Sequence, residues 1–282
     1  MSLTTTVTSD PLEVLSELRR TGERRSDVVM RIGGDLLLYG KTRSLGDEAW
    51  LIYEQVFDAA LDLADWEAAQ ACLEMLQEKF PVSKRVRLLD GKYHEARGIL
   101  DVAEQIYDEI LAEDETHVMA LKRKVALLKT KGDIKGAIGK LVEYVDCYTN
   151  DLEAWMELSA LYQSQCMYKQ AAYCQEELIL LQPIHHLHQI TYAEIMYTLN
   201  QMEVAAKSYC RALELSTAHP RALYGLKQCI LKLGGASRCK GVNHAKELDL
   251  MVIDQLTKAY EKACPRSQGQ ELRKVVDTWL ES

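Results

Sequence analysis

The sequence predicts an all-α protein in which pairs of antiparallel helices stack into a solenoid. Of its 282 residues 48% are hydrophobic, which is enough for a substantial core. Only five prolines and fifteen glycines are present, and Leu, Ala, Glu and Lys, which favour helix over strand, are frequent. The third observation is an alanine that recurs every 34 residues without insertion or deletion, at Ala69, Ala103, Ala137, Ala171 and Ala205. A fixed period in this range is typical of stacked helix-turn-helix units.

The positions around each alanine repeat with the same phase. Four and seven residues after each alanine the side chains are apolar, as on one face of a helix, with Gln175 as the exception. A second, preceding stripe includes Tyr53 and Trp155, each sixteen residues before its alanine. Pro81 and Pro183 lie twelve residues after their alanines, where a helix should end and the next unit begin. Each period therefore contains two helices.

This pattern resembles the tetratricopeptide repeat (TPR) family across residues 50–217. The fourth unit matches the family pattern best, at Trp155, Leu158, Ser159, Tyr162, Ala171, Leu178 and Pro183. The resemblance implies a superhelical arc, with the first helix of each pair lining a concave groove. The predicted fold class is an all-α TPR solenoid with helical caps at both ends.

We expect three segments along the chain: an N-terminal helical cap over residues 1–46, five TPR-like repeats over 47–218, and an irregular sixth repeat with a C-terminal helical cap over 219–282. In the N-terminal cap, Asp10 and Pro11 begin a short helix, and Ser26 begins another that runs to Tyr39.

At the C-terminal end the period is lost. A helix begins at Pro220, but Gly234, Gly235 and a polar loop displace its partner to about 244–264. A last helix, from about 268 to 281, is expected to pack Trp279. Irregular terminal units are expected, because they must cover the exposed apolar edge of the stack.

Charge and cysteine content exclude several classes of protein. The net charge of −8 argues against nucleic acid as the main ligand, which needs a broad positive surface. Eight scattered cysteines without metal-ligand spacing indicate buried thiols in a reducing compartment. No secretory leader pattern and no run of about 18 apolar residues occurs, so we expect a cytosolic or nuclear chain without a membrane span.

A basic stretch at residues 121–140 stands out in this acidic chain, with seven cations and one acid, Asp133. Helical phase places Lys122 and Lys129 on the groove side, and Arg123, Lys124 and Lys131 on other faces. The preceding helix, 101–115, carries seven acids and no base. Three interpretations of the stretch follow: its charge is neutralised by that helix, it contacts a partner in the groove, or it binds nucleic acid directly. The sequence favours the first two.

Helical phase gives ten candidate partner-binding residues on the groove side of the first helices. They are Glu54, Asp58, Arg85, Lys92, Lys122, Lys129, Met156, Gln163, Glu194 and Tyr197.

No catalytic, cofactor or metal site is predicted. The cluster His185, His186 and His188 lacks Cys or carboxylate partners at zinc spacing, and no phosphate-binding loop or nucleophile-base arrangement is present. An enzyme is not expected. TPR co-chaperones that bind a C-terminal carboxylate use Lys and Asn at set groove positions. Lys122 fits one of them, but Ala126 and Glu157 stand where the asparagines belong.

Beyond the generic repeat, several runs resemble subunit 2 of the endoplasmic reticulum (ER) membrane protein complex, the EMC. These runs are GDEAWLIYEQVFDAALD at 46–62, EQIYDEILAED at 104–114, ALKRKVALLKTKG at 120–132, DLEAWMELSALY at 151–162 and YKQAAYCQEELILLQP at 168–183. The similarity extends without gaps from about 46 to 215, and Trp50, Glu54 and Gln55 within it have no role in a generic TPR.

The resemblance implies a non-catalytic scaffold on the cytosolic face of the ER membrane, within a hetero-oligomer. Its partners would be cytosolic segments of membrane-embedded EMC subunits and a second soluble subunit, with no nucleic acid and no direct membrane span. The complex would insert tail-anchored and multipass membrane proteins. The alternative from the repeat alone is a soluble TPR co-chaperone or adaptor that binds peptide tails.

Overall fold

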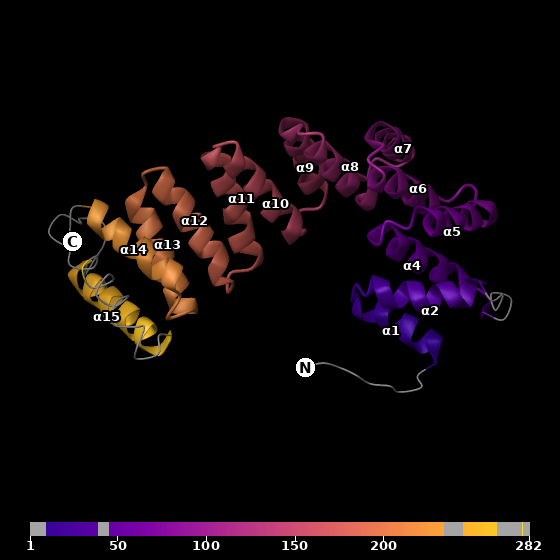
Figure 1. Ribbon diagram of the computed structural model, residues 1–282. Helices are drawn as coiled ribbons and strands as arrows, with labels where there is room; N and C mark the ends of the chain where they lie inside the picture. Colours follow the sequence, from indigo (N-terminus) through magenta and orange to yellow (C-terminus); the bar gives the residue numbers. More distant parts are fainter. Residues whose placement is uncertain (1–9, 39–44, 234–244, 264–277, 279–282) are drawn as a thin grey trace. The chain divides into compact units, whose positions relative to one another are not determined.

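The computed structural model describes residues 10–38, 45–233, 245–263 and 278, and within them the secondary structure is helical, without strands (Figure 1). The chain divides into two compact units, residues 1–140 and 141–282. The all-α fold predicted from the period is confirmed.

Unit 1 contains antiparallel helix pairs in chain order. The first pair, α1 and α2, packs through α2 onto α4. Next come the pairs α4–α5 and α6–α7, with α8 packed on α7. The bounds are α1 Pro11–Thr21, α2 Ser26–Leu38, α4 Glu48–Asp62, α5 Trp66–Lys79, α6 Lys84–Ala96, α7 Leu100–Glu113 and α8 Val118–Thr130, and α9, Ile134–Cys147, runs across the boundary between the units.

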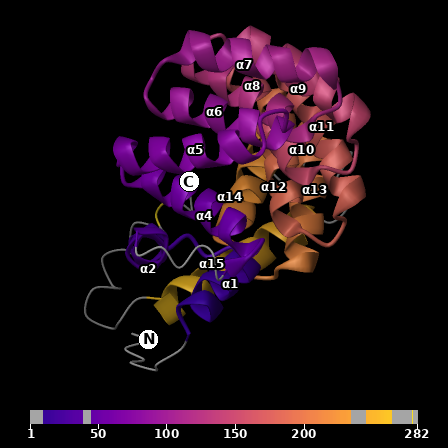
Figure 2. The same cartoon turned by 90° about the vertical axis from the view of Figure 1, so that its right-hand side faces the viewer.

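Unit 2 continues the pairing. Helix α10 pairs with α11 and α12 with α13, and α14 and α15 follow (Figure 2). The bounds are α10 Leu152–Ser164, α11 Tyr168–Leu181, α12 His186–Thr198, α13 Met202–Leu215, α14 Pro220–Lys232 and α15 Ala245–Ala263. The displaced partner expected at 244–264 is thus α15. The helix expected around Trp279 lies outside the described residues, and the three segment boundaries stay predictions.

Helix starts follow the capping residues that the sequence supplies. The Asp10 carboxylate accepts a hydrogen bond from the amide of Leu12 at 3.2 Å, and Pro11 occupies the first turn of α1, as expected. Asp65 and Asp151 cap α5 and α10 in the same way. These bonds satisfy amides that have no partner inside the helix.

The turn inside each helix pair has one conformation that recurs every 34 residues. A left-handed residue follows the first helix, and the next amide bonds back to a carbonyl five residues earlier, for example Asp65 to Ala60 at 2.9 Å. The left-handed residues are Ala64, Gly98, Gly132, Cys166 and Asn200. Ala64 and Cys166 carry a Cβ in a region that disfavours it, so the packing of the helix pair imposes this turn.

The repeating alanines lie in the core of the stacked helices. Ala69, Ala103, Ala137, Ala171 and Ala205 are fully buried. Beside Ala103, Gly91 of α6 packs against the ring of Tyr107 so closely that an added Cβ would lie 2.3 Å from a ring carbon. Small residues therefore set the distance between α6 and α7.

The exception in the apolar stripe, Gln175, is a buried polar contact. Its amide nitrogen donates to Ser159 Oγ at 2.9 Å, and that hydroxyl donates to the carbonyl of Ala171 at 3.3 Å. A hydrogen bond between α10 and α11 thus replaces the expected apolar contact.

The expectation of buried thiols is correct for some cysteines only. Cys72, Cys174 and Cys229 are buried, and burial raises the pKa of the Cys72 thiol to about 11 and that of Cys174 to about 12. Cys147 and Cys166 are exposed, because they lie at the end of α9 and in the turn after α10. Cys239 and Cys264 lie outside the described residues.

Candidate partner-binding site

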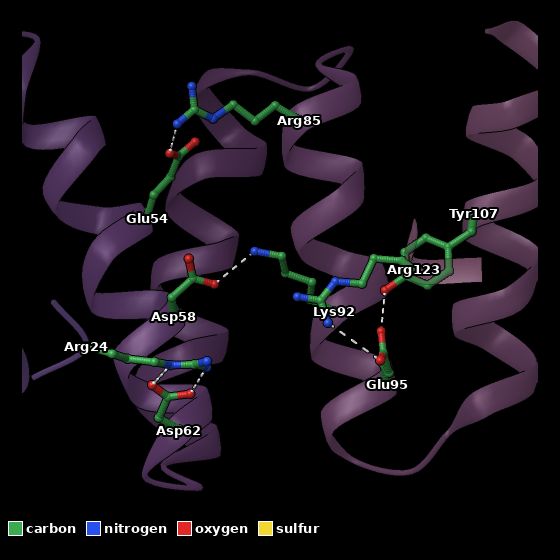
Figure 3. Close-up of polar contacts among 9 residues, drawn as sticks. All are labelled: Arg24, Glu54, Asp58, Asp62, Arg85, Lys92, Glu95, Tyr107 and Arg123. Atoms are coloured by element: carbon green, nitrogen blue, oxygen red, sulfur yellow. Dashed lines mark hydrogen bonds and ion pairs between the residues drawn. The ribbon is translucent and has the colours of Figure 1, made fainter. Parts of the chain in front are cut away.

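We call the exposed sides of the first helices the first-helix face. In unit 1 this face consists of α4, α6 and α8, and its charges are paired between neighbouring repeats (Figure 3). Arg85 of α6 donates to the Glu54 carboxylate of α4. Lys92 of α6 lies 3.1 Å from Asp58 of α4. Four predicted partner-binding residues are therefore brought together as two ion pairs that connect consecutive repeats.

A third pair ties the N-terminal helices to the same face. Arg24, between α1 and α2, donates from Nε and from one terminal guanidinium nitrogen to the two carboxylate oxygens of Asp62, at the end of α4. The Nε–Oδ2 distance is 2.7 Å. Ser26 donates to the same carboxylate at 2.6 Å. These hydrogen bonds hold the pKa of Asp62 below its usual value, Arg24 being the main cause.

Beneath these pairs lies a cavity of about 290 Å³ that opens between α4, α6 and α8. Glu95 of α6 accepts a hydrogen bond at 2.8 Å from the buried phenol of Tyr107. Arg123 of α8 lies 3.6 Å from the other oxygen of Glu95. The prediction that Arg123 lies away from the groove is therefore wrong. It lines the same cavity as Lys92 because it lies only one residue along α8 from the predicted groove position Lys122.

Two of the seven cations of the basic stretch are neutralised by the acidic helix α7. Lys124 is buried, and its ammonium lies 2.6 Å from Asp108 and 2.9 Å from Glu104. Lys131 lies 2.7 Å from Asp101 and also contacts Glu104. Both lysines hold the pKa of Glu104 below its usual value, Lys131 more strongly. The charges of these two lysines are thus paired within the chain, as the first interpretation predicted.

The remaining predicted residues of unit 1, Lys122 and Lys129, lie on α8, where Lys122 is half-buried and Lys129 is exposed.

The first-helix face of unit 2 consists of α10, α12 and α14, and it is less charged. Met156 is 51% exposed, and Gln163 donates to Ser159 Oγ at 3.3 Å. Glu194 of α12 accepts hydrogen bonds from two guanidinium nitrogens of Arg221, which lies on α14. The ring of Tyr197 lies 4.0 Å from the ammonium of Lys232. Of the predicted residues of this unit, Glu194 and Tyr197 lie where α12 meets α14.

Sequence reasoning missed four further residues of these faces: Glu95, Arg24, Arg221 and Lys232. Glu95 could have been found, because it precedes the predicted Lys129 by one repeat period. Arg24 could not, because it lies outside the repeats and meets Asp62 only in the folded chain. Arg221 and Lys232 belong to the irregular sixth unit, which the period does not cover.

The histidine cluster is larger than the sequence suggested, because His219 of the α14 N-terminus joins it. Ring centroids lie 4.3 Å apart for His185 and His188 and 5.3 Å apart for His186 and His219. In the described part of the chain, no three His, Cys, Asp or Glu side chains are placed so that they could hold a metal ion. Burial is the main cause that lowers the pKa of His188 and of His219, and a neighbouring histidine adds to it in each case.

This cluster predicts a loss of stability in mild acid. A lowered folded-state pKa means that the unfolded chain binds protons first as the pH falls. The contribution of His188 and His219 to stability is therefore fully present above pH 6.5, the ordinary imidazole value, and is lost as the pH falls through their folded-state pKa. Thermal unfolding should be followed from neutral pH to about pH 5 for the wild type and for the double variant His188→Gln, His219→Asn. The variant should lose less of its melting temperature, whereas equal slopes would contradict the prediction.

Stacked helix pairs, a buried alanine every 34 residues and a shared face of first helices define a TPR protein. A solved structure of the C-terminal part of a TPR repeat-containing protein from Cytophaga hutchinsonii has the same fold, with a TM-score of 0.60 at 14% identity, covering 88% of this chain and 94% of that one.

The family model of the EMC2 TPR-like repeat domain matches residues 68–214. The ER membrane protein complex subunit 2-B of Xenopus laevis is 36% identical over 281 residues, which is 97% of this chain and 94% of the relative. Subunit 2-A of the same organism is 40% identical over 220 residues, 77% of this chain and 74% of the relative. The chain belongs to the EMC2 family. Among its described helices, none combines the length and apolarity needed to cross a membrane.

Proposed function

We propose that this chain is a non-catalytic scaffold subunit of an ER membrane protein complex, which it joins from the cytosolic side. It would connect cytosolic segments of membrane-embedded subunits with a second soluble subunit. In this way it would support the insertion of tail-anchored and multipass membrane proteins. The observation that carries this proposal is the 36% identity to a named complex subunit along 97% of the chain.

The structure supports a scaffold role by the way its first-helix face is fixed. Glu54 with Arg85 and Asp58 with Lys92 join α4 to α6, and Glu194 with Arg221 joins α12 to α14. Within each unit these ion pairs keep neighbouring first helices in register. A preorganised face loses little conformational entropy when a partner binds, so more of the contact energy contributes to affinity.

The test is to isolate the tagged full-length chain from detergent-solubilised membranes and to identify its partners by mass spectrometry. The proposal requires a stoichiometric set of ER membrane proteins. If the chain is recovered from the soluble fraction, with a chaperone or peptide-tail protein instead, the adaptor alternative replaces it.

Reversing the charge of Lys122 and Lys129 to Glu should weaken partner recovery while leaving the fold intact. Both residues lie on α8, and helical phase predicts them on the groove side, where charge reversal would disfavour an oppositely charged partner surface. The matched control reverses Lys135 and Lys207, which are exposed on the second helices α9 and α13. Circular dichroism checks the fold of each variant. Equal recovery of partners by the variant and the control would refute a role for this face.

A further inference from the structure

The cavity on the first-helix face of unit 1 contains one cation that has no hydrogen-bond acceptor among the described residues. Its charged lining residues are Arg24, Asp58, Asp62, Lys92, Glu95 and Arg123. The numbers of cations and acids are equal, but their hydrogen bonds are not evenly distributed. The acids are largely satisfied by the chain itself, whereas one cation is not.

Each carboxylate of the cavity already has a donor. Asp62 is bonded by Arg24 and Ser26, and Asp58 by Lys92 at 3.1 Å. Glu95 is bonded by the phenol of Tyr107 at 2.8 Å, and Tyr107 is fully buried, so this bond is fixed by the core. The pKa of the phenol is raised by burial and by Glu95, which keeps it a donor.

Arg123 differs from the other arginines of the first-helix faces. Arg85 donates directly to Glu54, and Arg221 donates to both oxygens of Glu194. The nearest carboxylate oxygen to Arg123 lies 3.6 Å away, beyond hydrogen-bond distance, and the side chain is 36% exposed. Among the described residues, its guanidinium has no hydrogen-bond acceptor, although it lies at the cavity wall beside Lys92 (Figure 3).

We infer that this cavity binds a carboxylate carried by a partner polypeptide, with Arg123 as the binding residue and Lys92 beside it. A guanidinium binds a carboxylate through two parallel hydrogen bonds, which Glu95 does not supply because Tyr107 holds it. A cationic group would instead approach Arg24, Lys92 and Arg123 together. The inference rests on the proposed function only in that a partner chain supplies the carboxylate.

Acetate is the simplest probe of this site. In the ¹⁵N-labelled full-length chain, the Nε–H resonance of Arg123, assigned by its loss in Arg123→Lys, should move saturably with sodium acetate but not with sodium chloride at equal ionic strength. The Arg221 resonance, assigned through Arg221→Lys, is the internal control, because Glu194 already accepts hydrogen bonds from the Nε–H and from a terminal nitrogen of that guanidinium. An unmoved Arg123 resonance, or equal movement of both, would overturn the inference.

Three acetylated peptides then identify the source of the carboxylate: trialanine with a free C-terminus, trialanine amide, and Asp-Ala amide. Trialanine amide should not bind. Whichever of the other two binds more tightly shows whether the partner offers its terminus or an acidic side chain. Arg123→Gln should weaken that binding roughly tenfold, as loss of a charge-assisted bond implies. Equal binding of all three peptides would contradict the inference.

The failure of this site and of the proposed function can be told apart. If ER membrane proteins co-purify with the chain but acetate does not bind, the carboxylate site is wrong and the scaffold proposal stands. If acetate binds at Arg123 but no ER membrane protein co-purifies, the scaffold proposal is wrong and the site stands.

Discussion

Replacing Ala103 by leucine is expected to lower the free energy of unfolding of this protein by about 1–3 kcal/mol. Ala103 is fully buried in the same cluster as Leu88, Tyr107 and Leu127. Alanine and leucine have similar helix propensities, so the larger volume is the main change. The close packing of Gly91 on Tyr107 shows that there is no spare volume between α6 and α7 for a larger side chain. Ala171, its equivalent in unit 2, should respond in the same way.

The matched control in unit 1 is Ala112→Leu, at an exposed position of the same helix α7, where the change should stay within about 0.5 kcal/mol. Ala160, which is exposed on α10, serves the same purpose in unit 2. Urea unfolding followed by circular dichroism measures each difference. If Ala103→Leu unfolds at the same urea concentration as the wild type, the alanine does not set the distance between α6 and α7.

Replacing Lys124 by methionine is expected to cost about 1–3 kcal/mol, although methionine keeps most of the side-chain volume. The Lys124 side chain is only 9% exposed, and its ammonium bonds Asp108 and Glu104. Its loss leaves these acids close together on α7, a helix that carries five acids and no base. Asp108 is half-exposed, so water compensates part of the loss.

The control for this variant is Lys135→Met, an exposed lysine of α9 in the same basic stretch, which should be nearly neutral. The effect should also depend on pH with a definite sign. Because the pKa of Glu104 is lowered in the fold, its stabilisation is present above its ordinary value of 4.5 and is lost as the pH falls below it. The difference between wild type and variant should therefore shrink in acid. A constant difference would show that Lys124 acts through packing alone.

These two predictions separate the basic stretch into parts that its composition does not distinguish. Lys124 and Lys131 neutralise α7, Arg123 lines the cavity, and Lys122 and Lys129 stay candidates for partner binding. Helical phase predicts the groove side for Lys122, but it resolves a helix face only to about one residue. Arg123, the neighbour of Lys122, was therefore assigned to the wrong side.

The sequence by itself determined the helix pairs, because a 34-residue period with two apolar stripes can bury its apolar residues only by stacking like units. It also placed the helix ends at Pro81 and Pro183, which α5 and α11 confirm, because proline cannot continue a helix. Both signals are local or strictly periodic, so they can be read without knowing the fold.

Only the tertiary structure decided which charges meet. Arg24 finds Asp62 across 38 residues, and Tyr107 holds Glu95 so that Arg123 keeps its donors available. At Ala64 and Cys166 the residue type does not favour the left-handed turn, which the packing of each helix pair imposes. In each case the cause is the packing of separate helices, which brings groups together over distances that no sequence spacing specifies.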